Sequence, residues 1–308
     1  MKLTLRKYQS ENDYWKIRQF LREIFLLNER HETGWQPYRW DYWRWHVNEN
    51  IFRFDLSAAV FLWETEAGRL AALLHPEGAG EAFLQVHPAF QTTELEVEML
   101  SVAEIQFATT QAGGSQQLTI WAPGTDFLRQ DLLRRRGYIK GGHPEYQRRR
   151  SLEDPLPEVA IPAGYSLRAL GALDEHPARS WVSWKAFHPN EPDDQYQGWD
   201  WYRNLQRAPL YRRDLDLVAE ASNGELAAFG TLWFDDVTRT AAFEPVGTHP
   251  DHQRKGVGKA LMAEGLRRVR DLGATLCTVG SYSKAAGNLY ASLGFTQYDL
   301  SEPWTKEW

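Results

Sequence analysis

Residues 249–261 read HPDHQRKGVGKAL and place two glycines, Gly256 and Gly258, where an amphipathic helix begins. Apolar side chains then recur at helical spacing as far as Val269, and Gly273 is placed to end that helix. The first N–H groups of a helix have no partner inside the helix, and the helix dipole adds positive potential there. Glycine also lets a backbone come close to a phosphate. The stretch therefore predicts an anion site where a strand passes into a helix.

Two common phosphate-binding motifs do not fit this spacing. A P-loop needs a glycine five residues before its Gly-Lys pair and a Ser or Thr after the lysine, and those positions hold Gln253 and Ala260. A dinucleotide fingerprint needs a third glycine at the position of Leu261. The pattern that is present is Gln-x-x-Gly-x-Gly, formed by Gln253, Gly256 and Gly258.

The chain contains one sequence pattern twice. Matching segments recur in the same order at offsets of 156 to 162 residues: WDYW at 40–43 with WDWY at 199–202, GRLAA at 68–72 with GELAA at 224–228, VHPAFQ at 86–91 with THPDHQ at 248–253, and RRGY at 135–138 with SLGF at 292–295. A polar stretch with three prolines separates the two copies. We therefore predict two domains, residues 1–152 and 165–308, joined by a linker at 153–164.

Each copy alternates strand and helix signals, which predicts an α/β or α+β unit around a mixed sheet. In the second copy we expect an NG hairpin turn at Asn223 and Gly224, and an N-cap at Ser283. The expected strands are 165–170, 215–222, 225–234, 240–250, 274–282 and 295–300, with helical segments over 174–207, 257–272 and 284–294.

Composition excludes several classes of protein. The net charge of −6 disfavours a nucleic-acid partner, and the basic clusters LLRRRGY and QRRR are interpreted as solvated surface. The single cysteine, Cys277, forms no internal disulfide and is expected to be a buried, inert thiol. No run of 18 apolar residues and no leader-like N-terminus occurs, so we predict a cytoplasmic protein without a membrane partner. No cluster has metal-ligand spacing, so no metal is predicted.

The Gln-x-x-Gly-x-Gly loop resembles the pyrophosphate-binding motif of the GNAT superfamily of acyl-CoA-dependent N-acetyltransferases. The resemblance covers the whole second copy, because the loop follows a strand and precedes Asn288-x-Tyr290-x-x-x-Gly-Phe at the family's distance. It implies two tandem GNAT-like domains, each a mixed, mostly antiparallel twisted sheet flanked by helices, and acetyl-CoA as co-substrate. The cofactor-binding residues that it implies are Val246, Gly247, Thr248, Gln253, Arg254, Lys255, Gly256, Val257, Gly258, Lys259 and Asn288.

The chemistry of acyl transfer points to two catalytic residues. An alkylamine is mostly protonated at neutral pH, and removing its proton accounts for about 4 kcal/mol of the barrier. Glu244, an acid in an apolar strand, is the candidate base, with a strand-edge charge facing solvent as the alternative. Tyr290 matches the family position whose phenol protonates the departing thiolate, with a core aromatic as the alternative. The resemblance also implies that the backbone of Val246 and Thr248 pairs with the pantetheine arm, and that an N–H there faces the thioester oxygen.

The first copy lacks these groups. Gln91 aligns with Gln253, but Glu94 and Glu96 take the two glycine positions, where a carboxylate would repel a phosphate. The positions of Glu244, Asn288 and Tyr290 hold Ala82, Asp131 and Leu133. We therefore expect a degenerate first domain and one active site per chain, in a tandem architecture similar to that of the mycothiol synthases.

Tryptophan-rich segments mark the expected acceptor region of each copy. Between Trp184 and Trp199 the chain carries three acids, Glu191, Asp193 and Asp194, which would suit a cationic amine, although core packing and a solvated loop are the alternative. The leading function is N-acetylation of a primary amine on a small molecule or peptide-like acceptor. A non-catalytic acyl-CoA sensor and a protein-modifying enzyme that recruits its partner through the first domain remain open, as does a homodimer.

Overall fold

The computed structural model describes residues 2–308, which form two compact units. Unit 1 contains the described residues up to Gln147 together with Asp299–Trp308, and unit 2 contains Arg148–Tyr298. The chain therefore passes between the units twice. This division differs from the expected domains, because the last ten residues belong to unit 1 and the residues just after 147 belong to unit 2.

Unit 1 contains one mixed sheet. Its strands are β1 (Leu3–Lys7), β2 (Phe61–Thr65), β3 (Leu70–His75), β4 (Glu81–Val86), β5 (Thr109–Thr110), β6 (Gln116–Pro123), β7 (Ile139–Lys140) and most of β14 (Gln297–Glu307). Its helices are α1 (Glu11–Leu27), α2 (Pro37–Tyr42), the π-helical η1 (Trp43–Phe52), α3 (Leu56–Ala59), the short η2 (Pro88–Phe90), α4 (Thr93–Phe107) and α5 (Phe127–Arg135). The strand order is β1-β2-β3-β4-β6-β14, and β4 runs parallel to β6 whereas the pairs β1-β2, β2-β3, β3-β4 and β6-β14 are antiparallel.

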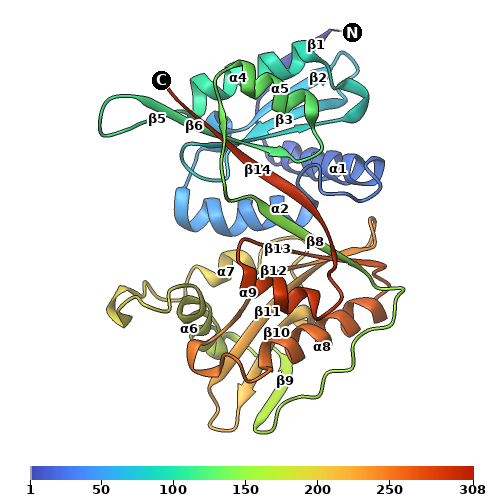
Figure 1. Cartoon of the computed structure of the whole chain (residues 1–308), viewed down its shortest axis with the longest axis vertical. Coiled ribbons are helices and arrows are strands. Elements are labelled where there is room, and N and C mark those ends of the chain that lie inside the picture. Colours follow the sequence, from blue (N-terminus) through green and yellow to red (C-terminus); the bar gives the residue numbers. More distant parts are fainter. Residues whose placement is uncertain (1) are drawn as a thin grey trace. The chain divides into compact units, whose positions relative to one another are not determined.

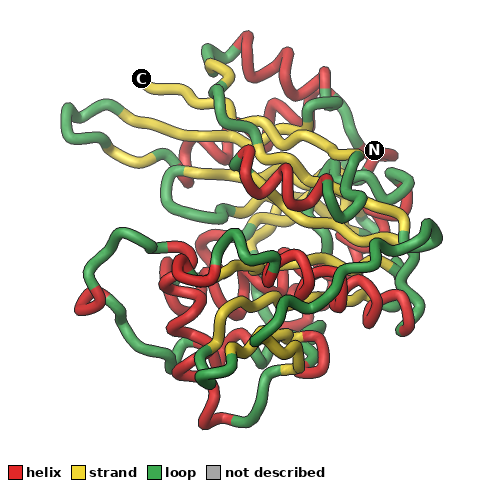
Figure 2. Tube along the Cα trace, turned by 60° about the horizontal axis from the view of Figure 1, so that its bottom comes forward, coloured by secondary structure: helices red, strands yellow, loops and turns green. Residues whose placement is uncertain are grey.

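Unit 2 repeats this arrangement. Its strands are most of β8 (Glu145–Ser151), β9 (Tyr165–Ala169), β10 (Asp216–Ala221), β11 (Leu226–Asp235), β12 (Thr240–Thr248) and β13 (Leu276–Ser281). Its helices are η3 (Leu173–Glu175), α6 (His176–Phe187), η4 (Asp193–Gln195), α7 (Tyr202–Leu205), η5 (Arg213–Leu215), η6 (Pro250–His252), α8 (Val257–Asp271) and α9 (Lys284–Ala291). Strands follow the order β8-β13-β12-β11-β10-β9, with β12 parallel to β13 and antiparallel to β11. Helices lie against the strands of each unit (Figure 2). The predicted fold class is therefore confirmed.

The two crossings of the chain have a structural cause. The C-terminal strand β14 pairs with β6 of unit 1 from Ser301 to Glu307, as its red ribbon beside β6 shows (Figure 1). In the other direction, β8 is a neighbour of β13, and the N–H of Leu152 donates to the carbonyl of Thr275. The repeat pattern assigned β14 to the second domain, but β14 pairs in unit 1. It assigned β8 to the first domain, but β8 is a neighbour of β13 in unit 2.

The predicted linker at 153–164 is partly packed. Leu156 and Val159 contact the hydrophobic core of unit 2, whose buried members include Leu261, Phe243 and Phe295. Within residues 2–308, no helix is both long enough and apolar enough to pass through a lipid bilayer.

Candidate active site

The strand β12 separates from its parallel neighbour where Glu244 occurs. Its pairing with β13 ends at Phe243, opposite Val279, whereas its pairing with β11 continues to Thr248. Two β12 residues, Glu244 and Pro245, lie opposite a single β11 residue, so the strand bulges there. Among the described residues, 246–248 therefore have a strand partner on one side only, and their other edge is not paired with β13.

Glu244 is held at this bulge through its backbone. The carbonyl oxygen of Glu244 accepts a hydrogen bond from the indole N–H of Trp233, which is fully buried on β11. The carboxyl group is half-buried and lies close enough to Tyr290 to raise the pKa of that phenol. The two predicted catalytic side chains are therefore close enough for the charge of Glu244 to act on the Tyr290 hydroxyl.

The glycine loop forms an uncapped helix start. Gly256 is the N-cap of α8 with a φ of 84°, a left-handed conformation that favours glycine. No side chain caps this helix, and its first turn is formed by Val257, Gly258 and Lys259. In this part of the described chain the N–H groups of that turn are therefore open to an external anion.

Gly258 is a glycine because of a close approach. A Cβ at this position would lie 2.6 Å from Oγ1 of Thr248, well inside an ordinary contact. The start of α8 thus packs directly on the end of β12. Gly247 has a similar reason, since its Cβ would lie 2.6 Å from the Phe229 ring and 3.0 Å from Cβ of Ala186 on α6. The sequence analysis assigned both glycines to cofactor binding. The packing of β12 against α8 and α6 is an independent reason for glycine at these two positions.

The predicted cations of the loop have no partner within residues 2–308. Arg254 and Lys255 are exposed, Lys259 is half-buried, and none of the three forms a hydrogen bond or ion pair with the described protein. Gln253 differs, because its Nε2 donates to the carbonyl of Thr248 at 3.2 Å and closes the loop onto β12. The loop therefore presents positive charge around an open helix start.

The helix α9 carries the remaining predicted residues. Ser283 caps it as predicted, since its hydroxyl accepts from the N–H of Ala286 at 3.2 Å. Asn288 is exposed, whereas Tyr290 is only 6% exposed. Burial raises the pKa of Tyr290 well above its ordinary value, Glu244 raises it further, and the positive charge of Arg148 lowers it.

Two arginines of β8 that pack against α9 and the turn after it were missed from the sequence. The QRRR cluster was interpreted as solvated surface, and this is wrong for Arg150, which is 6% exposed and donates to the carbonyl of Leu293. A Cβ at Gly294 would lie 2.8 Å from Arg150 Nη1, and a Cβ at Gly287 would lie 2.8 Å from Arg148 Nη2. The glycines around α9 were the signal, because each leaves room for a guanidinium group.

A buried polar network lies opposite the bulge. Arg179 on α6 and Asp216 on β10 are both fully buried, with 3.3 Å between Nε and Oδ1. Asp216 also accepts from the hydroxyls of Tyr202, Tyr211 and Thr231. Thr231 is the β11 residue that faces the bulge, so this network fixes the strand behind Glu244. The isolated charges Arg179 and Asp216 gave no signal in the sequence.

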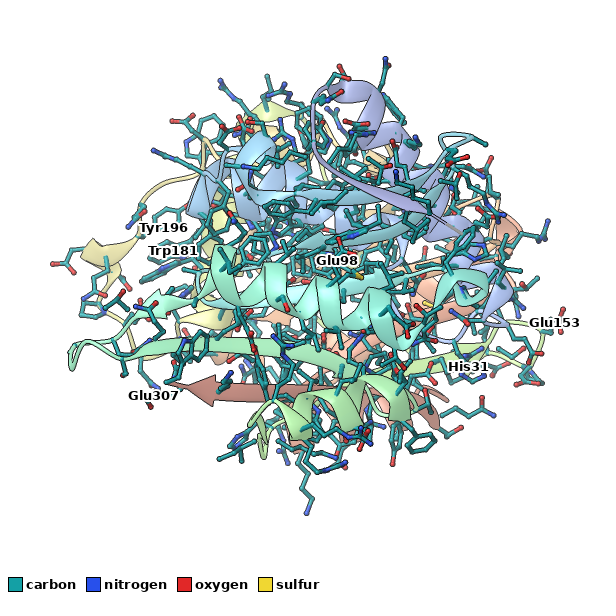
Figure 3. All side chains as sticks on the ribbon, turned by 90° about the horizontal axis from the view of Figure 1, so that it is seen from above. His31, Glu98, Glu153, Trp181, Tyr196 and Glu307 are labelled. Carbon is teal, nitrogen blue, oxygen red and sulfur yellow. The ribbon has the colours of Figure 1, made fainter. Side chains whose placement is uncertain are left out.

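The aromatic segment of the expected acceptor region already contains a cation. Trp181 stacks on Trp184 at 5.5 Å between ring centroids, and Tyr196 meets Trp181 edge-on at 5.2 Å. Figure 3 labels Trp181 and Tyr196 side by side. Lys185 lies over both indoles and pairs with Asp193 at 3.0 Å. The protein's own ammonium group therefore takes the position that the sequence suggested for an acceptor amine.

The corresponding region of unit 1 is closed by its own side chains. Thr92 caps α4 by accepting from the N–H of Leu95, so the helix start is not open. Glu96, at the second glycine position, is fully buried and pairs with Arg129 at 2.8 Å. Arg129 also donates to the carbonyl of Leu84, which aligns with Val246.

Comparisons with known proteins agree with this geometry. A family model described as the acetyltransferase (GNAT) family matches residues 176–295. A mycothiol acetyltransferase of Rhodococcus jostii is 31% identical over 256 residues, covering 76% of this chain and 79% of that protein. The corresponding protein of Pseudarthrobacter chlorophenolicus is 27% identical over 252 residues, covering 76% and 72%.

Solved structures share the fold. A tandem GNAT protein from the clavulanic acid biosynthesis pathway superposes with a TM-score of 0.68 at 17% identity, covering 99% of this chain and 98% of that one. An acetyltransferase of the GNAT family from Colwellia psychrerythraea superposes with a TM-score of 0.63 at 14% identity, covering 99% and 100%.

Proposed function

Because the chain belongs to the GNAT family of acetyltransferases and is an N-acetyltransferase, we propose that it transfers the acetyl group of acetyl-CoA directly to a primary amine. The observation that carries this proposal is the open, positively charged start of α8 beside the free edge of β12. The acceptor is a small-molecule or peptide-like amine. Relatives that are named mycothiol acetyltransferase support a small acceptor.

The diphosphate of coenzyme A is assigned to the first turn of α8. The N–H groups of Val257, Gly258 and Lys259 would donate to its oxygens, and Arg254 and Lys255 would add charge. Helix N–H groups and ammonium or guanidinium groups are the donors that phosphates accept best. The unpartnered cations and the missing side-chain cap support this assignment.

The pantetheine arm is assigned to the free edge of β12. Val246, Gly247 and Thr248 would pair with its amides like an added strand, because β13 has already separated from them. Since Gln253 occupies the Thr248 carbonyl, we assign Gln253 to loop closure rather than to direct contact. Asn288 is exposed on α9 and would contact coenzyme A from that side.

Glu244 and Tyr290 supply the proton transfers. Glu244, directly or through water, would accept the proton of the acceptor ammonium, and the free amine would then form the N–C bond as the C–S bond breaks. The nitrogen would release its second proton to water as the amide forms. The proton of the Tyr290 hydroxyl would pass to the coenzyme A thiolate. Burial keeps Tyr290 protonated at neutral pH, which an acid requires.

The test combines binding and turnover. Titration calorimetry with acetyl-CoA is expected to give a 1:1 complex, and a panel of amines and amino acids is assayed for acetyl-CoA-dependent thiol release. Glu244→Gln is expected to lower kcat about 100-fold or more with little change in acetyl-CoA affinity. The absence of acetyl-CoA binding contradicts the proposal. Binding without thiol release for any amine identifies an acyl-CoA sensor instead.

A further inference from the structure

A guanidinium group lies against the helix face that carries Tyr290. Arg148 comes from β8, and its Nε donates to the hydroxyl of Ser281 at the end of β13, at 3.2 Å. Its guanidinium carbon lies 5.6 Å from the Tyr298 ring centroid. The same group covers Gly287, where a Cβ would lie 2.8 Å from Nη2. These contacts fix the cation at the junction of β13 and α9.

Gly287 and Tyr290 are three residues apart on α9, so they lie on one face of the helix. Tyr290 is 6% exposed, and the charge of Arg148 acts on its phenol against the effects of burial and of Glu244. A phenolate at this position would gain from a nearby cation, because burial makes an uncompensated charge costly. Glycine at 287 is what allows the guanidinium group to come this close.

We propose that Arg148 is a positioning residue for the acetyl transfer, which offsets the negative charge left on Tyr290 when its proton passes to the departing thiolate. This inference rests on the proposed function. As the N–C bond forms and the C–S bond breaks, the Tyr290 hydroxyl proton moves to the sulfur. The nitrogen releases its second proton to water as the amide forms, and the phenolate regains a proton from the solvent. In this role Arg148 would act through Tyr290 and not on either substrate.

The experiment is a double-mutant cycle measured at saturating acetyl-CoA. Arg148→Gln is expected to lower kcat about 10-fold or more, while KM for acetyl-CoA stays within about threefold. Arg148→Lys keeps the cation and is expected to recover most of kcat. Tyr290→Phe removes the acid, so Tyr290→Phe with Arg148→Gln should be no slower than Tyr290→Phe alone, within about twofold.

Arg270→Gln is the matched control, because Arg270 is an exposed cation at the end of α8 in the same unit. It should leave kcat unchanged, and thermal unfolding is followed for every variant. Each of three results would overturn the proposal. They are additive losses of kcat in the double variant, a wild-type kcat in Tyr290→Phe, and a kcat of Arg148→Lys as low as that of Arg148→Gln. Failure of the proposed function is distinguishable, because the wild-type chain would then show no thiol release.

Discussion

Gly258→Ala tests the close approach that places the start of α8. The added Cβ would lie 2.6 Å from Thr248 Oγ1, about 0.8 Å short of an ordinary contact. Overpacking of this kind costs about 1–3 kcal/mol, and alanine returns up to about 1 kcal/mol through its higher helix propensity. We therefore expect the wild-type position of the first helical turn to be destabilised by a net 1–2 kcal/mol, roughly, in Gly258→Ala, so that the turn is displaced.

The displaced turn carries the N–H groups that are assigned to the diphosphate. In the free variant the turn relieves the contact by moving, and binding has to return it to its wild-type position. If this return costs about 1.4 kcal/mol, which is a factor of ten in an equilibrium constant, the Kd for acetyl-CoA rises about tenfold in titration calorimetry. Thr248→Ala removes Oγ1 and keeps the backbone. The double variant Thr248→Ala with Gly258→Ala should therefore return Kd to within about threefold of wild type.

Two results would refute this reasoning. If Gly258→Ala binds acetyl-CoA as tightly as the wild type, the first turn of α8 does not hold the diphosphate. If the double variant is as weak as Gly258→Ala alone, the contact with Thr248 is not what makes glycine necessary.

Three further predictions concern unit 1 and the aromatic segment. Burial, and then Glu145, raises the pKa of Glu32 to about 7 from 4.5. The folded chain therefore keeps a proton that the unfolded chain releases, and the free energy of unfolding should fall by up to about 3 kcal/mol as pH rises from 4.5 to 7. Urea unfolding at several pH values checks this, and Glu32→Gln should remove the Glu32 share of the dependence and leave that of Asp41, whose pKa burial raises to about 6. Glu96→Gln should lower the free energy of unfolding by about 3–5 kcal/mol, because it removes the carboxylate that pairs with the buried Arg129 at 2.8 Å and leaves only Asp126 at 3.5 Å, and a loss below about 1 kcal/mol would contradict the buried pair. Asp193→Asn should leave kcat/KM for an identified amine within about threefold, since Asp193 already pairs with Lys185, and a larger fall would place the acceptor ammonium there.

The sequence predicted the elements around the site because they depend on local patterns. The NG hairpin, the Ser283 cap and the glycine-started helix at 257 are all present in the structure. Gly256 has a left-handed backbone conformation, which glycine adopts readily because it has no Cβ. The α/β class followed from the alternation of such signals, and the enzyme class from the resemblance of the glycine loop and its surroundings to the GNAT motif.

The contacts of Arg150 and Glu96 could not be predicted in this way. Arg150 reaches Leu293 across 143 residues, and Glu96 reaches Arg129 across 33. Neither partner can be identified from the residues next to it in the chain. From the sequence alone, Arg150 and Glu96 could therefore equally be solvated surface residues.

The sequence by itself determined the strand-loop-helix unit, its repetition, and the loop that is proposed to hold the diphosphate. Only the tertiary structure decided that β14 completes unit 1, that β8 joins unit 2, and that Arg148 lies over Gly287. The physical reason is that turns, caps and helix starts are set within a few residues. Backbone hydrogen bonds between strands are the same for every sequence, so the choice of a distant strand partner depends on how the whole chain packs.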